Sequence, residues 1–255
     1  MKSFGGFLIN GAVVYGEVRG EQVHFLKQAP WLGIDFSGEV DSLGKVEIAL
    51  PVAPSKVIAV GLNYADHIKE MQRTEIGSPL IWFKAPSSLL PPNGTIEIAF
   101  PGHKTDFETE LAIVIGRMAK NVSLARALDF VFGYTIALDI SDRDLQKAEK
   151  QFSRCKSFDT YTPVGPFIQT EIDVGDLEIS LRQNGVVRQT ARTSQMIYSV
   201  ARIIAFASES LTLLPGDLIL TGTPSGVGAI AEGDELVATL SDWPPLRNQV
   251  ARARS

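Results

Sequence analysis

Two glutamates at the start of an apolar segment are the residues with the clearest chemical potential. Glu108 and Glu110 open a run that continues to Ile115 and is predicted to be a β-strand. Side chains two positions apart share one face of a strand, so both carboxylates should point the same way. Like charges on a buried strand need compensation, which a divalent cation can supply through oxygen ligands. The same spacing is also common on solvated strand faces, and this alternative stays open from spacing alone.

Asp139 is a candidate third ligand. It ends the apolar run 134–138, which is predicted to be a strand, and it precedes a segment with helical character at 141–151. A carboxylate at a strand end can join two others around a hard cation such as Mg²⁺. The alternative is that Asp139 only helps to cap the following helix.

His67 and Glu70 are candidates for general-base chemistry. They lie three positions apart in a short polar segment, so they share a face if it is helical. A carboxylate that orients a histidine ring makes the ring a suitable base. Such pairs also occur often as surface residues without a chemical role.

Three further positions bear on the chemistry. Lys156 can neutralise surplus carboxylate charge or bind an anionic substrate, and its neighbour Cys155 lacks the histidine-centred arrangement of a nucleophile. The glycine-rich stretch 221–228 lacks the lysine of a phosphate-binding loop. It is predicted to be a tight loop that offers backbone N–H groups and the Thr223 hydroxyl to a ligand.

The elements that must position these residues indicate an α+β fold with many strands and few helices. Residues 1–50 are predicted to form a small β unit, residues 55–241 the catalytic domain, and residues 242–255 a solvated tail. Asn10-Gly11 and Asn184-Gly185 are typical of tight hairpin turns. The ranges with helical character are 66–73, 123–130, 141–151 and 196–208.

Composition narrows the class of protein. The chain has 255 residues, a net charge of −5 and no basic stripe, so we expect no nucleic-acid partner. It has one cysteine, which excludes an internal disulfide and favours a reducing compartment. No apolar run approaches the roughly 18 residues of a membrane span. These features predict a cytoplasmic protein with no membrane partner.

The order of the motifs resembles the fumarylacetoacetate hydrolase family, especially its small single-domain members, the acylpyruvate hydrolases and oxaloacetate decarboxylases. The resemblance covers the run from Lys56 to about Leu240, which is about three quarters of the chain. The similar segments follow the family order within this run and are 61–67, 106–111, 137–139, 143–146, 156–158, 193–197 and 220–228.

This resemblance implies a mixed, barrel-like β fold, a homodimer, and Mg²⁺ or Mn²⁺ held by Glu108, Glu110 and Asp139. It implies that Lys156 supports the metal site or the substrate. It also implies that the substrate is contacted by Arg143, Gln146 and Thr223, and that His67 and Glu70 form a catalytic dyad on a mobile lid helix within 64–77.

The function predicted from the resemblance is divalent-metal-dependent hydrolysis of a C–C bond in an acylpyruvate-type 2-oxo acid. An oxaloacetate decarboxylase and a 2-hydroxymuconate-type isomerase would use the same metal site and remain alternatives, as does a non-catalytic metabolite-binding module. Leu62 stands where some small relatives carry arginine, and the N-terminal unit is shorter than in the enzyme that names the family.

Overall fold

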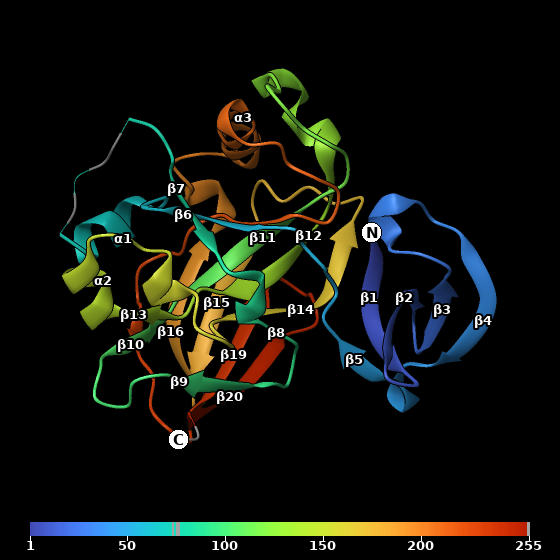
Figure 1. Cartoon of the computed structure of the whole chain (residues 1–255), viewed down its shortest axis with the longest axis horizontal. Coiled ribbons are helices and arrows are strands. Elements are labelled where there is room, and N and C mark those ends of the chain that lie inside the picture. Colours follow the sequence, from blue (N-terminus) through green and yellow to red (C-terminus); the bar gives the residue numbers. More distant parts are fainter. Residues whose placement is uncertain (73, 75–76, 254–255) are drawn as a thin grey trace.

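A computed structural model describes residues 1–72, 74 and 77–253 of the chain. Three sheets contain nearly all of the regular structure, and helices are few and short (Figure 1). No helix in the described ranges is long and apolar enough to cross a membrane. The expected α+β class is therefore confirmed.

The largest sheet has twelve strands in the order β4-β3-β2-β1-β14-β12-β11-β17-β6-β7, with β5 on β1 and β8 on β14. The order ends at β4 and β7, so no closed barrel is found in the described part of the chain. The strands are β1 (Lys2–Ile9), β2 (Ala12–Arg19), β3 (Gln22–Leu26), β4 (Phe36–Ser42), β5 (Glu47–Ala49), β6 (Val57–Gly61), β7 (Leu80–Lys84), β8 (Leu89–Leu90), β11 (Thr109–Ile115), β12 (Val131–Leu138), β14 (Thr162–Thr170) and β17 (Leu218–Leu220).

Two smaller sheets complete the β structure. A five-stranded sheet has the order β16-β15-β19-β20-β9, and a three-stranded sheet has the order β13-β10-β18. Their strands are β9 (Thr95–Ile98), β10 (Thr105–Phe107), β13 (Ser141–Asp142), β15 (Glu178–Gln183), β16 (Val186–Arg192), β18 (Gly228–Ala229), β19 (Glu235–Leu240) and β20 (Leu246–Arg252).

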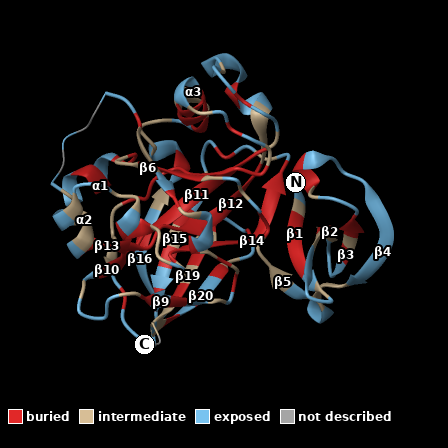
Figure 2. Ribbon diagram, in the orientation of Figure 1, coloured by how far each residue is buried: buried red, intermediate tan, exposed pale blue. Residues whose placement is uncertain are grey.

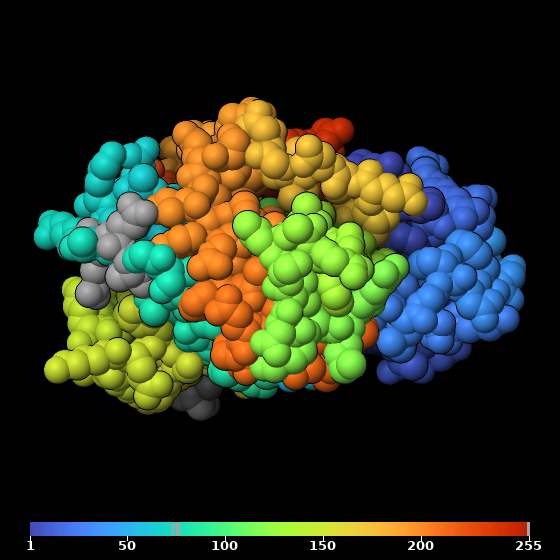
Figure 3. All heavy atoms as spheres, turned by 90° about the horizontal axis from the view of Figure 1, so that it is seen from above, coloured from blue at the N-terminus to red at the C-terminus, as the bar shows by residue number. Residues whose placement is uncertain are grey.

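Helical structure lies at the edges of the sheets (Figure 1). Helix α3 packs against the 3-10 helix η4, and these two segments lie side by side on the face shown in Figure 3. The helices are α1 (Ala65–Glu70), α2 (Arg143–Glu149) and α3 (Val200–Ser210), with 3-10 helices η1 (Pro30–Leu32), η2 (Leu43–Lys45), η3 (Pro86–Ser88), η4 (Leu124–Phe130), η5 (Arg154–Lys156) and η6 (Thr193–Gln195).

The central strands are apolar on both faces, which explains why they are buried (Figure 2). One face of β11 carries Leu111, Ile113 and Ile115 into the main core, which includes residues of the five-stranded sheet and α3. The other face carries Ala112 and Val114 into a second core. From Leu111 on, both faces of β11 are apolar, so the polar side chains lie at the start of the strand, as the sequence predicts.

The N-terminal residues form five strands that Figure 1 shows as a lobe to one side. They are nevertheless part of the twelve-stranded sheet, because β1 pairs with β14 through Lys2 and Thr170. The predicted turn at Asn10-Gly11 is confirmed, with φ angles of 51° and 81° between β1 and β2.

The predicted C-terminal tail is wrong for its central part. Residues Leu246–Arg252 form β20, which pairs with β19 and, in parallel, with β9. The buried side chains of Leu246 and Val250 explain the difference, because they alternate with exposed neighbours as in a strand with one core face. Polar residues separate Leu246 from Val250, so this segment has no continuous apolar run that would predict a strand.

Two predicted helix starts and one strand are also corrected. Asp142, not Ser141, caps α2 by accepting the N–H of Leu145, because Ser141 pairs with Asp106 in the small sheet. The helix expected from residue 196 begins at Val200 behind the cap Ser199. The strand expected over 108–115 is interrupted at position 108, where β10 ends and β11 has not begun.

Candidate metal centre and active site

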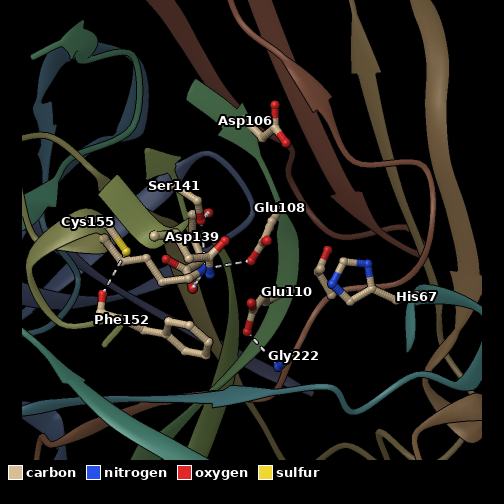
Figure 4. A network of polar contacts seen from close by, with 12 residues as sticks. His67, Asp106, Glu108, Glu110, Asp139, Ser141, Phe152, Cys155 and Gly222 are labelled. Atoms are coloured by element: carbon tan, nitrogen blue, oxygen red, sulfur yellow. Dashed lines mark hydrogen bonds and ion pairs between the residues drawn. The ribbon is translucent and has the colours of Figure 1, made fainter. Parts of the chain in front are cut away.

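The three predicted metal ligands meet at one point (Figure 4). Oxygen atoms of Glu108, Glu110 and Asp139 all lie within 4.8 Å of one another. Strand pairing causes this, because Thr109 is opposite Leu138 and the Asp139 N–H donates to the Glu108 carbonyl at 2.8 Å. All three side chains are buried. The alternative of a solvated strand face is therefore wrong for this pair of glutamates.

Lys156 compensates part of this charge, as expected. Its Nζ donates to Glu108 Oε2 at 2.8 Å, to Asp139 Oδ2 at 2.7 Å and to Ser141 Oγ at 2.6 Å. Burial would lower the pKa of Lys156, but the charges of Asp139 and Glu108 outweigh it and the pKa is raised. The lysine is thus a fixed cation on one side of the acidic cluster.

Lys84 is a second buried cation that the sequence analysis missed. It ends β7, and its Nζ contacts Asp139 Oδ1 at 2.5 Å and the Tyr161 carbonyl at 3.0 Å. Its side chain is fully buried, and burial lowers its pKa despite the attraction of Asp139. A lysine that directly follows the apolar run 80–83 was the available signal, because such a residue is seldom buried without a partner.

Arg143 lies at the other side of Glu108. Its Nη2 donates to Glu108 Oε1 at 2.5 Å and its Nε donates to Asp106 Oδ2 at 2.8 Å. Burial opposes the charge of Glu108, yet the net effect raises the pKa of Arg143, which stays a cation. Gln146 is held one helical turn away, where its Oε1 accepts from Arg143 Nη1 at 3.0 Å.

Glu110 is the carboxylate of the cluster without a cationic partner among the described residues. Its Oε2 accepts only the Gly222 N–H, at 2.6 Å. Burial and the neighbouring Asp139 and Glu108 charges raise the pKa of Glu110 well above its ordinary value. The pKa of Glu108 is lowered instead, because Lys156 and Arg143 together outweigh its burial.

This uneven compensation fits a divalent cation. Three buried carboxylates offer hard oxygen ligands of the kind that Mg²⁺ and Mn²⁺ accept. A cation between them would supply to Glu110 the positive charge that the protein gives to Glu108 and Asp139.

The His67–Glu70 pair forms as expected within α1. His67 Nδ1 and Glu70 Oε2 are 3.1 Å apart, and the ring is buried. The glycine-rich loop fixes the carboxylate, because Glu70 Oε1 accepts the Gly226 N–H at 3.0 Å. With Nδ1 held in this way, Nε2 is the ring nitrogen left for chemistry in the cavity.

A cavity of about 540 Å³ joins the dyad to the acidic cluster. His67 lines this cavity, whereas Asp139 is fully buried and contacts it through the lining residue Lys156. The other predicted residues that line the cavity are Glu108, Glu110, Arg143, Gln146, Lys156 and Thr223. One chamber therefore brings a base, an acidic cluster and an arginine together.

Thr223 reaches the cavity with its hydroxyl already engaged. Its Oγ1 donates to the Thr109 carbonyl at 2.9 Å and accepts from Gln189 Nε2 at 2.8 Å. Gln189 is buried, also accepts the Thr109 N–H, and was not predicted. Nothing in the local sequence marks it, because its partners lie on the distant segments around 109 and 223.

Two other expectations concern the surroundings of the site. Cys155 is buried, its Sγ donates to the Phe152 carbonyl at 3.2 Å, and burial raises its pKa to about 11, which disfavours a thiolate nucleophile. The lid was expected over 64–77. Helix α1 ends at Glu70, and residues 73, 75 and 76 lie outside the described ranges, so lid motion stays a prediction.

Comparisons with known proteins find a matching family model and similar sequences. A family model described as fumarylacetoacetate (FAA) hydrolase C-terminal matches residues 56–251. The chain is 38% identical over 218 residues to the mitochondrial oxaloacetate tautomerase Fahd2a of Rattus norvegicus, covering 81% of this chain and 70% of that protein.

Solved structures show the same relationship over the whole chain. The structure of a 2-hydroxyhepta-2,4-diene-1,7-dioate isomerase from Mycobacterium marinum is 39% identical, with a TM-score of 0.92 and full coverage of both chains. That of a 5-carboxymethyl-2-hydroxymuconate delta-isomerase from Mycobacterium smegmatis is 38% identical, with a TM-score of 0.92, covering 99% of this chain and 100% of that one.

Proposed function

Because the chain belongs to the fumarylacetoacetate hydrolase family, a family of enzymes, we propose that it is a divalent-metal-dependent enzyme that interconverts keto and enol forms of a 2-oxo acid. One observation carries the proposal: the His67 ring and the buried carboxylates Glu108 and Glu110 line the same cavity. The tautomerase and isomerase names of similar proteins support this reaction class.

Glu108, Glu110 and Asp139 would hold the cation, with Mg²⁺ or Mn²⁺ as candidates. When bound, the metal would act as a Lewis acid toward the carboxylate and 2-oxo oxygens of the substrate. Lys84 and Lys156 offset part of the negative charge of the carboxylates and hold Asp139 in place.

His67 is the proposed base. Its Nε2 takes a proton from the carbon next to the 2-oxo group, and the electron pair of that C–H bond forms the C–C double bond. The protonated ring then returns its proton to the oxo oxygen, which gives the enol and restores the base. Glu70 orients the ring through the contact with Nδ1. Guanidinium N–H groups of Arg143 beyond those used by Asp106, Glu108 and Gln146 can bind the substrate carboxylate.

Hydrolysis of an acylpyruvate C–C bond is a second candidate for the same site. The His67–Glu70 dyad favours it, because the same nitrogen can deprotonate a water molecule that attacks the distal carbonyl. Decarboxylation of oxaloacetate needs no activated water and should depend less on His67.

The cellular setting and assembly are part of the proposal. We place the protein in the cytoplasm with a small 2-oxo acid as its partner, and expect neither nucleic acid nor membrane to bind. We also expect a homodimer, and light scattering at micromolar concentration that returned only the monomer mass would contradict it.

The test uses metal-depleted protein with Mg²⁺ or Mn²⁺ added back. Keto–enol exchange of oxaloacetate and cleavage of acetylpyruvate are followed by ultraviolet absorbance, with His67→Gln as the variant and His24→Gln as the control for loss of a distant histidine. We expect metal-dependent exchange that falls strongly in His67→Gln only. Exchange that is unaffected by chelation would refute the metal dependence, and equal rates in both variants would refute the base.

A further inference from the structure

We infer that the 2-oxo acid taken by this site ends in an uncharged apolar group, aromatic or branched, rather than in a second carboxylate. The inference rests on the proposed function, because it assumes that the 2-oxo acid end binds at the acidic cluster. It concerns the rest of the cavity, whose walls are mainly apolar, whereas the end with the acidic cluster is charged.

Six apolar side chains line the cavity beside the charged cluster, together with the polar side chains of Gln72 and Thr74. The apolar side chains come from β6 and the residue after it, from the residue after α1, from β7 and from the segment after α2. These side chains are Val60, Leu62, Met71, Leu80, Trp82 and Phe152. Such a surface gains free energy from apolar groups and offers few hydrogen-bonding partners to a charged one.

An aromatic pair fixes the shape of this wall. The rings of Trp82 and Phe152 pack edge to face, with centroids 5.1 Å apart and planes at 88°. Trp82 lies tightly over Gly61, where an added Cβ would come within 2.8 Å of its ring. The Lys156 ammonium is 5.3 Å from the Trp82 ring centroid, so the aromatic wall begins next to the acidic cluster.

The cations of the cavity are already engaged at its charged end. Lys156 uses its three N–H groups on Glu108, Asp139 and Ser141. Arg143 donates to Glu108, Asp106 and Gln146, and in the proposed function its remaining N–H groups bind the carboxylate of the 2-oxo acid end. Of the described residues that line the cavity, no other is a lysine or arginine.

Among the described residues of this wall, a second carboxylate would therefore meet mainly rings and aliphatic groups, with the side chains of Gln72 and Thr74 but no cation. Burying an unpaired carboxylate is costly, whereas a phenyl group would gain free energy from the contact with Trp82 and Phe152. Lys150 lines an adjacent cavity of about 450 Å³ rather than this one. A substrate with a compact apolar end fits the observed walls best.

Binding of two matched oxamates tests the inference without relying on turnover. N-phenyloxamate and N-(carboxymethyl)oxamate share the chelating end and differ only in the distal group. We measure both, and oxalate, by isothermal titration calorimetry with full-length protein and Mg²⁺. We expect N-phenyloxamate to bind at least about tenfold more tightly than the dicarboxylate, a difference typical of one well-placed apolar group.

Three variants locate the effect. Trp82→Leu should weaken N-phenyloxamate by about tenfold while oxalate stays within about threefold. Phe152→Lys should narrow or reverse the preference, because it adds a cation to the apolar wall. Phe83→Lys is the matched control for the added cation. Phe83 lies on β7 next to Trp82, but it is exposed and does not line this cavity.

The outcomes separate the two proposals. If oxalate binds with Mg²⁺ and the dicarboxylate binds as tightly as N-phenyloxamate or more tightly, the inference is wrong while the proposed function stands. If oxalate shows no Mg²⁺-dependent binding, the proposed function fails and takes the inference with it.

Discussion

Exchanging Glu110 for glutamine should have opposite effects on stability with and without metal. Glu110→Gln keeps the size of the side chain and removes its charge. Glu110 has no cationic partner in the described structure, and its neighbours in the cluster are two further carboxylates. Two unit charges 4.8 Å apart repel by about 3.5 kcal/mol at an effective dielectric constant of roughly 20.

The net gain is smaller than this repulsion for two reasons. Lys156 attracts Glu110, and the raised pKa lets the metal-free protein bind a proton at Glu110 instead of bearing the full cost. The pKa of Glu110 is higher in the folded than in the unfolded protein. Glu110 therefore favours folding at low pH, and this contribution is lost as the pH rises from the unfolded-state pKa through the folded-state pKa. We expect Glu110→Gln to stabilise the metal-free protein at neutral pH by about 1–2 kcal/mol, or roughly 2–8 °C in Tm.

Metal should reverse the order. Mg²⁺ at 100 times its Kd stabilises the wild type by about 2.7 kcal/mol. The variant should lose most of this gain, because removal of a charged ligand weakens metal binding by at least about 100-fold. Differential scanning calorimetry with chelator and with Mg²⁺ measures both effects.

Glu108→Gln is the matched control, two residues away in the same cluster. Glu108 is paired with Lys156 and Arg143, so its neutralisation should destabilise the metal-free protein by about 3 kcal/mol or more. If both variants lower the metal-free Tm alike, Glu110 is not the uncompensated charge and the reasoning from the contacts is refuted.

Three other predictions address separate residues. His67→Ala should lower kcat by about 10²–10⁴-fold, the usual contribution of a general base. The metal Kd measured by calorimetry should stay close to that of the wild type. A large change in that Kd would argue against the base role. Lys84→Met should lower the free energy of unfolding in urea by about 3–5 kcal/mol, because it leaves Asp139 buried with one cation fewer. A change below about 1 kcal/mol would show that Lys84 is dispensable for stability. Cys155 should react with a thiol reagent only on unfolding, because it is buried and its pKa is raised to about 11; rapid labelling of the native protein would contradict this.

The sequence predicted the ligand set because its signals are local. Glu108 and Glu110 lie two positions apart at the start of the apolar run that forms β11, and Asp139 directly follows an apolar strand. His67 and Glu70 are also local, since three-residue spacing in a helix is enough to bring their side chains to 3.1 Å. The order of these motifs then indicated the family, which the match to residues 56–251 confirms.

Residues whose roles depend on distant partners could not be predicted in this way. Lys84 meets Asp139 across 55 positions, and Gln189 meets Thr109 across 80. The C-terminal strand β20 likewise depends on β9, which lies about 150 residues earlier in the chain. No local pattern encodes such pairs.

By itself, then, the sequence determined which groups could bind a cation and act as a base, because strand and helix periodicity places neighbouring side chains on a common face. Only the tertiary structure decided how the charges are shared. Among the described residues, Lys84, Lys156 and Arg143 donate hydrogen bonds to Asp139 or Glu108, whereas the hydrogen bond to Glu110 comes from a backbone N–H. Burial makes that difference matter, because a charge removed from water depends on the few groups that the fold brings into contact with it.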